Sequence, residues 1–185
     1  MQNKVKIIGG EWRSRNITFI DSEGLRPTPA RVRETLFNWL QHAILGRRCL
    51  DLYAGSGALS FEAASRGAKA VVQVENNPLI CRKLHENAQT LKATNLKIVQ
   101  SDVFRFLAEN NSEPFDVVFL DPPFGKNLAV PTCQWLEEKG WLNPNATIYV
   151  EVEQKLALQE MPENWHLLKQ KTAGEVAYHL YTNHP

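Results

Sequence analysis

Apolar residues along this chain fall into short, nearly continuous runs that alternate with segments of helical periodicity. The runs predict strands near residues 48–53, 70–75, 96–100, 115–120, 146–152, 165–171 and 176–183. Helices are expected near residues 57–66, 78–92, 103–110, 127–139 and 153–160. Strands with few polar residues are typical of a parallel sheet that is buried on both faces. The last two strands are separated only by Thr172–Glu175, so they must pair antiparallel.

Residues 1–47 precede this alternation and are expected to form an extension of the main domain, residues 48–185. Two short segments alternate apolar and polar positions and predict a β-hairpin: residues 5–8 and 16–19. Thr28 followed by Pro29 suits the N-cap and the first residue of a helix. The apolar face of that helix consists of Val32, Leu36, Phe37, Trp39 and Leu40.

Length and composition favour a single globular protein. The chain has 185 residues, of which 43% are hydrophobic, enough for a substantial core. No apolar run approaches the roughly 18 residues of a membrane span, and the polar start Met1–Lys4 has no signal-peptide core behind it. Three widely spaced cysteines without a C-x-x-C motif predict reduced thiols rather than a disulfide framework or a zinc site. We expect a soluble, cytoplasmic protein.

The net charge of +1 conceals a basic amino-terminal segment. Residues 1–48 carry nine Lys and Arg against four Asp and Glu, a net charge of +5, and the remainder carries −4. This asymmetry favours contact with a polyanion, and a solvated basic face without a partner is the alternative. The side chains considered for RNA contact are Trp12, Arg13, Arg15, Arg31 and Arg33. The tryptophan would add an aromatic surface for looped RNA, and the last two arginines are expected to point away from the apolar helix face.

A strand, a glycine turn and a helix start follow one another at Leu50–Leu59. Gly55 and Gly57 stand where a ligand can approach the backbone closely, because no Cβ intervenes. Twenty residues after Gly55, Glu75 ends the next strand and is placed to accept hydrogen bonds from two ribose hydroxyls. The spacing therefore predicts a cofactor that contains a nucleoside.

Features absent from this turn narrow the choice of cofactor. The dinucleotide fingerprint needs a third glycine where this chain has Ser60, and no phosphate-binding lysine follows. A pyrophosphate is therefore disfavoured. Asp51, on the preceding strand, suits a ligand with a cationic amine. S-adenosylmethionine fits these features, with its adenosine at Glu75 and its amino acid and sulfonium at the turn.

Asp102 ends the third strand of the main domain. Ligands of parallel sheets gather at the carboxyl ends of the strands, so this carboxylate is placed to accept a hydrogen bond from an adenine amine. It equally suits the N-cap of the following helix. The two roles are compatible.

Asp121, Pro122, Pro123 and Phe124 follow the fourth strand and form the most specific signal in the chain. The two prolines cannot donate backbone hydrogen bonds and keep the segment extended, which leaves carbonyls for a ligand. Phe124 offers a face on which a base can stack. An exocyclic base amine would donate to the Asp121 carboxylate and to a carbonyl, which returns electron density to its nitrogen. Methyl transfer from a sulfonium then depends on alignment and needs no metal.

These motifs, in this order, resemble those of class I S-adenosylmethionine-dependent methyltransferases that modify exocyclic amines. Four segments are more closely similar to the bacterial RsmD family: Ile7–Arg15, Arg26–Leu40, Asp51–Gly57 and Val176–Tyr178. The similarity runs along the whole chain. It implies a Rossmann-like α/β fold with a seven-stranded, mostly parallel sheet and an antiparallel last strand. It also implies methylation of N2 of one guanine in 16S rRNA of the small ribosomal subunit.

The resemblance also implies roles for single residues. It assigns cofactor binding to Gly55, Gly57, Glu75, Asp102 and the backbone of Val103, with S-adenosylhomocysteine as the product. The charge argument given above adds Asp51 to this set. Asp121, Pro122, Pro123 and Phe124 would receive the target base, and the amino-terminal hairpin would contact the RNA. Some guanine-N2 enzymes carry Asn in place of this Asp, so the motif alone does not separate guanine from adenine.

Two alternative functions stay open at this point. A DNA adenine-N6 methyltransferase would share the glycine turn and the Asp121 segment, but it would need more protein for duplex reading than the first 48 residues provide. An RNA-binding assembly factor could hold the cofactor without turnover. Our working expectation is a monomer that acts on 16S rRNA within the small subunit or its assembly intermediate, without a membrane or a metal.

Overall fold

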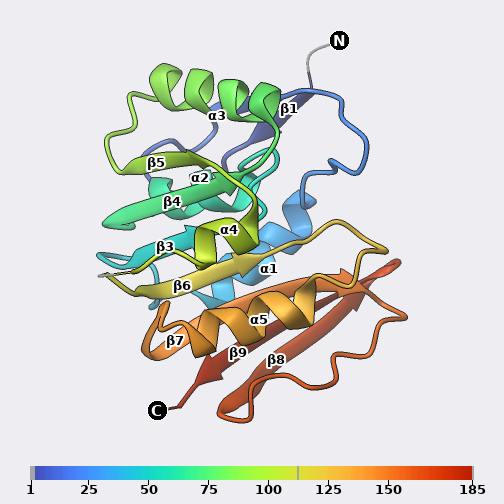
Figure 1. Ribbon diagram of the computed structural model, residues 1–185. Coiled ribbons are helices and arrows are strands. Elements are labelled where there is room, and N and C mark those ends of the chain that lie inside the picture. Colours follow the sequence, from blue (N-terminus) through green and yellow to red (C-terminus); the bar gives the residue numbers. More distant parts are fainter. Residues whose placement is uncertain (1–2, 112, 185) are drawn as a thin grey trace.

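The computed structural model describes residues 3–111 and 113–184 and forms a layered α/β fold (Figure 1). Seven strands form one sheet in the order β5-β4-β3-β6-β7-β9-β8. Their bounds are β3 Arg48–Asp51, β4 Ala70–Glu75, β5 Leu96–Gln100, β6 Phe115–Leu120, β7 Leu142–Glu153, β8 Trp165–Ala173 and β9 Val176–Asn183. The strands from β5 to β7 are parallel, and β9 is antiparallel to both of its neighbours. The predicted mostly parallel sheet with an antiparallel last strand is confirmed.

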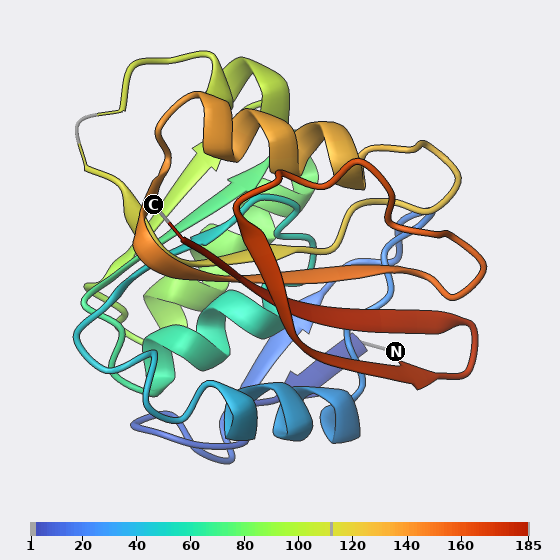
Figure 2. The same cartoon turned by 90° about the horizontal axis from the view of Figure 1, so that it is seen from below.

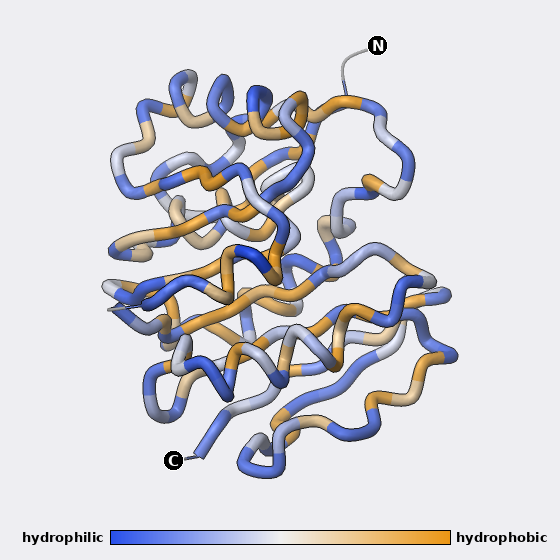
Figure 3. Tube along the Cα trace, in the orientation of Figure 1, coloured by the Kyte–Doolittle hydropathy of each residue, from blue (hydrophilic) through white to orange (hydrophobic). Residues whose placement is uncertain are grey.

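Helices cover both faces of this sheet (Figure 2). They are α1 Ala30–Trp39, α2 Ala58–Ser65, α3 Pro78–Thr90, α4 Val103–Leu107 and α5 Ala129–Glu138. Side chains alternate along each strand, so Cys49 and Phe119 pack with α1, α2 and α3, whereas Leu50 and Leu120 pack with α4 and α5. In Figure 3 the apolar colour runs along most of β6, as expected for a strand covered on both faces. Within the described residues, no helix is long and apolar enough to cross a membrane.

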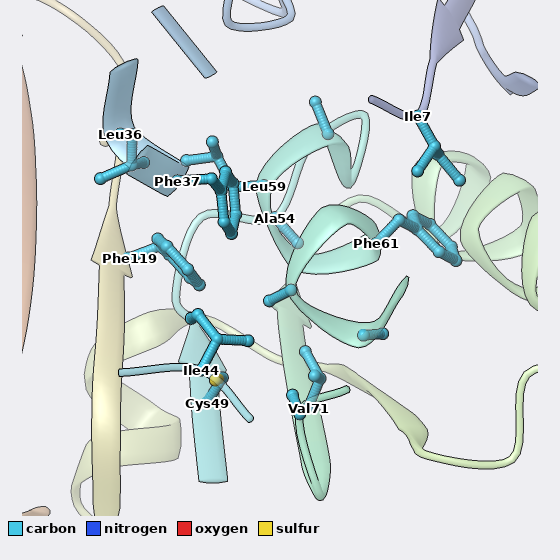
Figure 4. Packing of buried hydrophobic residues seen from close by; sticks show 14 of the residues in the cluster. Ile7, Leu36, Phe37, Ile44, Cys49, Ala54, Leu59, Phe61, Val71 and Phe119 are labelled. Atoms are coloured by element: carbon cyan, nitrogen blue, oxygen red, sulfur yellow. The ribbon is translucent and has the colours of Figure 1, made fainter. Parts of the chain in front are cut away.

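The amino-terminal residues form the expected hairpin, with a shifted first strand. β1 (Asn3–Lys6) pairs antiparallel with β2 (Asn16–Phe19). Strand β1 ends at Lys6, and two residues later the backbone N–H of Ile8 donates to a side chain of α2. Ile7 is buried and lies against Phe61 of α2 (Figure 4). The extension thus shares the core of the main domain. The predicted boundary between an extension of residues 1–47 and a main domain of residues 48–185 stays a prediction.

Glu62 on α2 connects the hairpin with α1 and α2. Its buried carboxylate accepts hydrogen bonds from the backbone N–H groups of Ile8 (2.8 Å) and Gly9 (2.9 Å). It also forms salt bridges with Arg33 (3.4 Å) and Arg66 (2.9 Å). Four N–H donors therefore meet one carboxylate, and the hairpin is fixed to the main domain through a buried charge.

Helix α1 begins at Ala30, one residue later than predicted. Pro29 precedes the first helical residue, and no side chain caps the helix. The Thr28 hydroxyl donates instead to Glu151 Oε2, at 3.4 Å. The prediction that Thr28 caps this helix is therefore wrong, because a carboxyl group on a distant strand takes its hydroxyl.

The helix expected at residues 153–160 does not form. Strand β7 extends into this range, and residues 154–164 follow it without helix. The apolar residues of the segment pack against the cluster between the sheet and helices α4 and α5: Leu156, Leu158 and Met161. Their spacings of two and three positions suit an irregular path, whereas one helix face needs spacings of three and four.

Candidate active site

Four acidic residues singled out in the sequence lie at one edge of the sheet. Asp51 and Glu75 end β3 and β4, and Asp102 and Asp121 follow β5 and β6. These four strands are parallel neighbours in the order β5-β4-β3-β6, so their carboxyl ends meet at the same edge. Ligands of open α/β sheets bind at this edge. We call this carboxyl-terminal end of the parallel strands the site edge.

The turn between β3 and α2 holds its two glycines in left-handed conformations. Gly57 has a φ of +79°, and a Cβ there would lie 2.6 Å from the Phe61 ring and 2.9 Å from Leu84. Close packing of α2 and α3 thus requires this glycine. Gly55 has a φ of +53°, and a Cβ there would meet nothing closer than 3.9 Å. The open space beside Gly55 fits the close approach of a cofactor.

Two backbone N–H groups orient the half-buried side chain of Glu75. Gly55 N–H donates to Oε1 at 3.1 Å, and Asn77 N–H donates to Oε2 at 2.9 Å. Each carboxylate oxygen retains a second lone pair. The carboxylate is therefore held at the strand end, beside the glycine turn, with capacity for two hydroxyl donors. This arrangement fits the ribose of S-adenosylmethionine.

Replacement of Glu75 by alanine is expected to weaken S-adenosylmethionine binding by about 1 to 3 kcal/mol, because the ribose hydroxyls and two backbone N–H groups lose their acceptor. Isothermal titration calorimetry measures the change directly. Glu138→Ala removes the same charge from the exposed end of α5 and serves as the matched control. An unchanged dissociation constant for Glu75→Ala would remove this residue from the cofactor site.

Asp51 is buried at the end of β3, with only 2% of its surface exposed. Burial raises the pKa of this carboxyl from 3.8 to about 7, although hydrogen bonds from Ser60 and from the Tyr53 backbone oppose the shift. Ser60 Oγ accepts in turn from Gln73 Nε2 at 2.8 Å. The side chain is therefore part of a buried polar network beneath the glycine turn.

This raised pKa predicts a pH-dependent stability. The folded protein binds the Asp51 proton more tightly than the unfolded chain, so stability falls as pH rises from about 4 to about 7. Asp51→Asn removes this contribution. The free energy of unfolding of the wild type, minus that of the variant, is expected to fall by up to a few kcal/mol across this range. Urea titrations at several pH values measure the difference, and a pH-independent difference would contradict the prediction.

Asp102 is the N-cap of α4. Its Oδ1 accepts hydrogen bonds from the backbone N–H groups of Phe104 (2.9 Å) and Arg105 (3.1 Å), which confirms the capping role. The side chain is exposed, and its second oxygen takes no part in these bonds. Val103, the first residue of α4, belongs to the helix turn whose N–H groups lack intrahelical acceptors. Both residues are suitably placed for an adenine ring.

The segment after β6 presents polar and aromatic groups at the site edge. Asp121 is half-buried, Pro122 is buried, and Pro123 is exposed. Phe124 is 48% exposed, and an exposed ring offers a stacking surface for a base. Gly125 N–H donates to Glu153 Oε1 at 2.5 Å and ties the segment to the end of β7.

Sequence reasoning missed Glu151, which lies on β7 beside this segment. Burial and the negative charge of Glu151 raise the pKa of Asp121 well above its ordinary value. Burial also raises the pKa of Glu151. The signal that could have found it is an acidic residue inside the apolar run 146–152. Residues 3–111 and 113–184 contain no group of three or more His, Cys, Asp or Glu arranged to hold a metal ion.

Two of the residues considered for RNA contact belong to the interior. Trp12 is 5% exposed and joins the core, while its backbone N–H donates to Ser65 Oγ at 2.9 Å. Arg33 is 4% exposed and donates to Glu62 and to backbone oxygens. The predictions that Trp12 offers a stacking surface and that Arg33 points outward are therefore wrong.

The three remaining arginines are exposed and lie at two different places. Arg13 and Arg15 follow the loop that packs on the last residue of α2, far along that helix from the site edge. Arg15 also donates to the backbone oxygen of Thr90 at the end of α3. Arg31 instead lines a small, partly open pocket together with Tyr149 and Tyr178. Only Arg31 of these three stands beside strands that reach the site edge.

Known proteins resemble this chain over nearly its whole length. The family model described as Conserved hypothetical protein 95 matches residues 5–182. Ribosomal RNA small subunit methyltransferase D of Escherichia coli strain K12 is 48% identical over 96% of this chain and 89% of its own length. The protein of the same name from Haemophilus influenzae is 49% identical over 98% of this chain and 95% of its own length.

Solved structures agree with this similarity. The structure of yhhF from Escherichia coli superposes with a TM-score of 0.92 at 44% identity, covering 98% of this chain and 99% of that one. Its agreement extends to the amino-terminal hairpin, because nearly every residue of both chains is matched. On this evidence the chain belongs to the Conserved hypothetical protein 95 family, which is the RsmD family that its motifs resemble.

Proposed function

We propose that this protein transfers a methyl group from S-adenosylmethionine to the exocyclic N2 of one guanine in 16S rRNA of the small ribosomal subunit. The observation that carries the proposal is the site edge. It sets a glycine turn with an oriented carboxylate, Glu75, beside the segment Asp121–Phe124 on a neighbouring strand. The relatives named above are rRNA small subunit methyltransferases, which supports both the reaction and the class of substrate.

Some residues of the site would bind the cofactor, and others would bind the target base. Glu75 would accept the ribose hydroxyls, and Asp102 and the Val103 backbone would hold the adenine. S-adenosylmethionine supplies an activated methyl group on a sulfonium. Asp121 would accept a hydrogen bond from the target amine, and Phe124 would stack on the base. The chain's contribution is mainly alignment, which supplies about 7 to 11 kcal/mol in well-oriented reactions.

The target guanine has to leave its stack to reach Asp121. Unstacking costs a few kcal/mol and is least costly in a loop or other unpaired region. This favours rRNA over duplex DNA as the substrate, because a paired and stacked base costs more to extrude than an unpaired one. The small subunit or its assembly intermediate, a monomeric enzyme and a cytoplasmic location are parts of the same proposal.

Methylation by the purified protein tests this function. The protein is incubated with labelled S-adenosylmethionine and with small subunits, free 16S rRNA or DNA from cells that lack the enzyme. We expect one guanine of the rRNA to gain one N2 methyl group, as mapped by mass spectrometry of nuclease fragments, and no label in DNA. Labelled adenine in DNA would support the alternative enzyme, and cofactor binding without any transfer would support an assembly factor.

Replacement of Arg31 by alanine is expected to weaken RNA binding and to reduce the slope of log K against log salt by about 1, as for the loss of one phosphate contact. The reason is its exposed position beside the strands of the site edge. Binding measured at several salt concentrations gives the slope. Arg13→Ala and Arg15→Ala are matched variants away from this edge, and we expect smaller changes for them. A wild-type slope for Arg31→Ala would return this arginine to a solvated face.

A further inference from the structure

We propose that Glu151 is a specificity-determining residue, which accepts a hydrogen bond from N1–H of the target guanine and thereby excludes bases with an acceptor at that position. The inference rests on the proposed function and deepens it. The segment Asp121–Phe124 alone does not distinguish guanine from adenine, and Glu151 would supply that distinction.

The register of the sheet places Glu151 beside Asp121. Strands β6 and β7 are parallel, and Leu120 pairs with Val150, so the next residue on each strand stands next to the other. Side chains alternate between the faces of a sheet. Phe119 and Tyr149 pack on the face that carries α1, so Asp121 and Glu151 project toward that same face.

Glu151 has acceptor capacity that the described contacts do not use. It is 5% exposed. Its Oε2 accepts from the Thr28 hydroxyl at 3.4 Å and from the Tyr149 hydroxyl at 3.5 Å, both at the long limit of hydrogen bonding. None of the salt bridges in the described residues includes it. Buried carboxylates are normally paired with a cation or fully hydrogen-bonded.

Glu62, the other buried glutamate discussed above, differs from Glu151 in its hydrogen-bond partners. Both glutamates are buried, but Glu62 meets four N–H donors at 2.8 to 3.4 Å. Glu62 therefore has an evident structural role. Glu151 has two long hydroxyl contacts, and its remaining side-chain partner is the carboxyl group of Asp121, with which it shares a hydrogen bond. No N–H group of the described residues donates to it, so the N–H donors of a bound base would replace the contact between the two acids. Burial disfavours the charged forms of Asp121 and Glu151, and N–H donors from a ligand would stabilise them.

Guanine carries the donors that this pair of acids requires. Its Watson–Crick edge presents N2–H and N1–H side by side, and enzymes that act on flipped bases read this edge by hydrogen bonds. Asp121 would accept from the amine, and Glu151 would accept from N1–H. Adenine has an unprotonated N1 beside its amine, so its acceptor would face a carboxylate. Leaving such a buried group unpaired is unfavourable.

RNA that carries 2-aminopurine at the methylated position tests the role of Glu151. This base keeps the amine at C2 but lacks N1–H. The wild-type enzyme is expected to prefer guanine by about 5- to 150-fold in kcat/KM. Glu151→Gln can donate its amide N–H to the bare N1, so its preference is expected to shrink by at least about 5-fold. The missing O6 of 2-aminopurine affects both enzymes equally and cancels in the ratio of their preferences.

The controls separate this role from a structural one. A merely structural Glu151 would lower both rates together and leave the preference at its wild-type value, which would overturn the inference. Glu138→Gln, an exposed change of equal charge on α5, should keep the wild-type preference. If Glu151→Gln does not fold, Glu151→Asp shortens the reach of the carboxylate and should lower only the guanine rate. A wild-type enzyme without activity on guanine RNA would contradict the proposed function itself.

Discussion

Replacement of Asp121 by alanine is expected to lower kcat for methyl transfer by about 10²- to 10³-fold, the usual cost of losing one preorganised hydrogen-bond partner of a transition state. The amine nitrogen of guanine is a weak nucleophile, because its lone pair is delocalised into the ring. A hydrogen bond to the Asp121 carboxylate returns electron density as the new bond forms. Single-turnover kinetics with saturating S-adenosylmethionine measures this step directly.

Cofactor binding and folding provide the controls for this variant. Asp121 follows β6, whereas the ribose acceptor Glu75 ends β4, so the dissociation constant for S-adenosylmethionine should stay within about 2-fold of wild type. Burial and Glu151 disfavour the charge of Asp121, so its removal should not destabilise the fold. Asp121→Asn keeps one acceptor oxygen and should retain more activity than alanine. Normal turnover by Asp121→Ala would remove this residue from catalysis.

Replacement of Glu62 by alanine is expected to destabilise the protein by about 3 to 5 kcal/mol, the range seen when one partner of a buried ion pair is removed. The change would leave the guanidinium of Arg33 buried and two backbone N–H groups without their acceptor. Because these groups join the hairpin to the main domain, we expect the hairpin and the main domain to be destabilised together. Urea unfolding monitored by circular dichroism measures the loss.

Glu86→Ala provides the matched control for Glu62. Glu86 pairs with Lys83 at 2.7 Å on the surface of α3, with 53% of its side chain exposed. Surface pairs of this kind contribute about 0 to 1 kcal/mol, so the control should barely change the midpoint of unfolding. Equal effects of the two substitutions would contradict the role given to the buried carboxylate.

The apolar runs of the sequence were sufficient to predict every strand of the main sheet. A buried parallel strand needs apolar residues on both faces, so its signal is local, as in Phe115–Leu120. The glycine turn and the acids at the strand ends are also local features. Their meeting at one edge follows from the parallel arrangement alone.

The contacts that could not be predicted join residues far apart in the chain. The position of Trp12 depends on Ser65, and that of Arg33 depends on Glu62. Nothing near a residue in sequence reveals such a partner, so a basic and aromatic segment looked like an exposed surface. The helix predicted at residues 153–160 was wrong for a related reason. Contacts with the core, and not helical periodicity, determine the path of residues 154–164. Glu151 differs from these cases, because an acidic residue within the apolar run 146–152 is a local signal that could have been read.

The central claim is that the glycine turn with Glu75 and the segment Asp121–Phe124 bring the cofactor and the base together. A crystal structure with S-adenosylhomocysteine and guanosine tests this claim most directly. In a near-attack arrangement the reacting atoms lie about 3 to 3.5 Å apart, so sulfur and N2 should be separated by about 5 Å, with room for one methyl group between them. We predict this separation, with N2 facing Asp121. A sulfur more than about 10 Å from Asp121, with protein side chains filling the gap, would contradict the account.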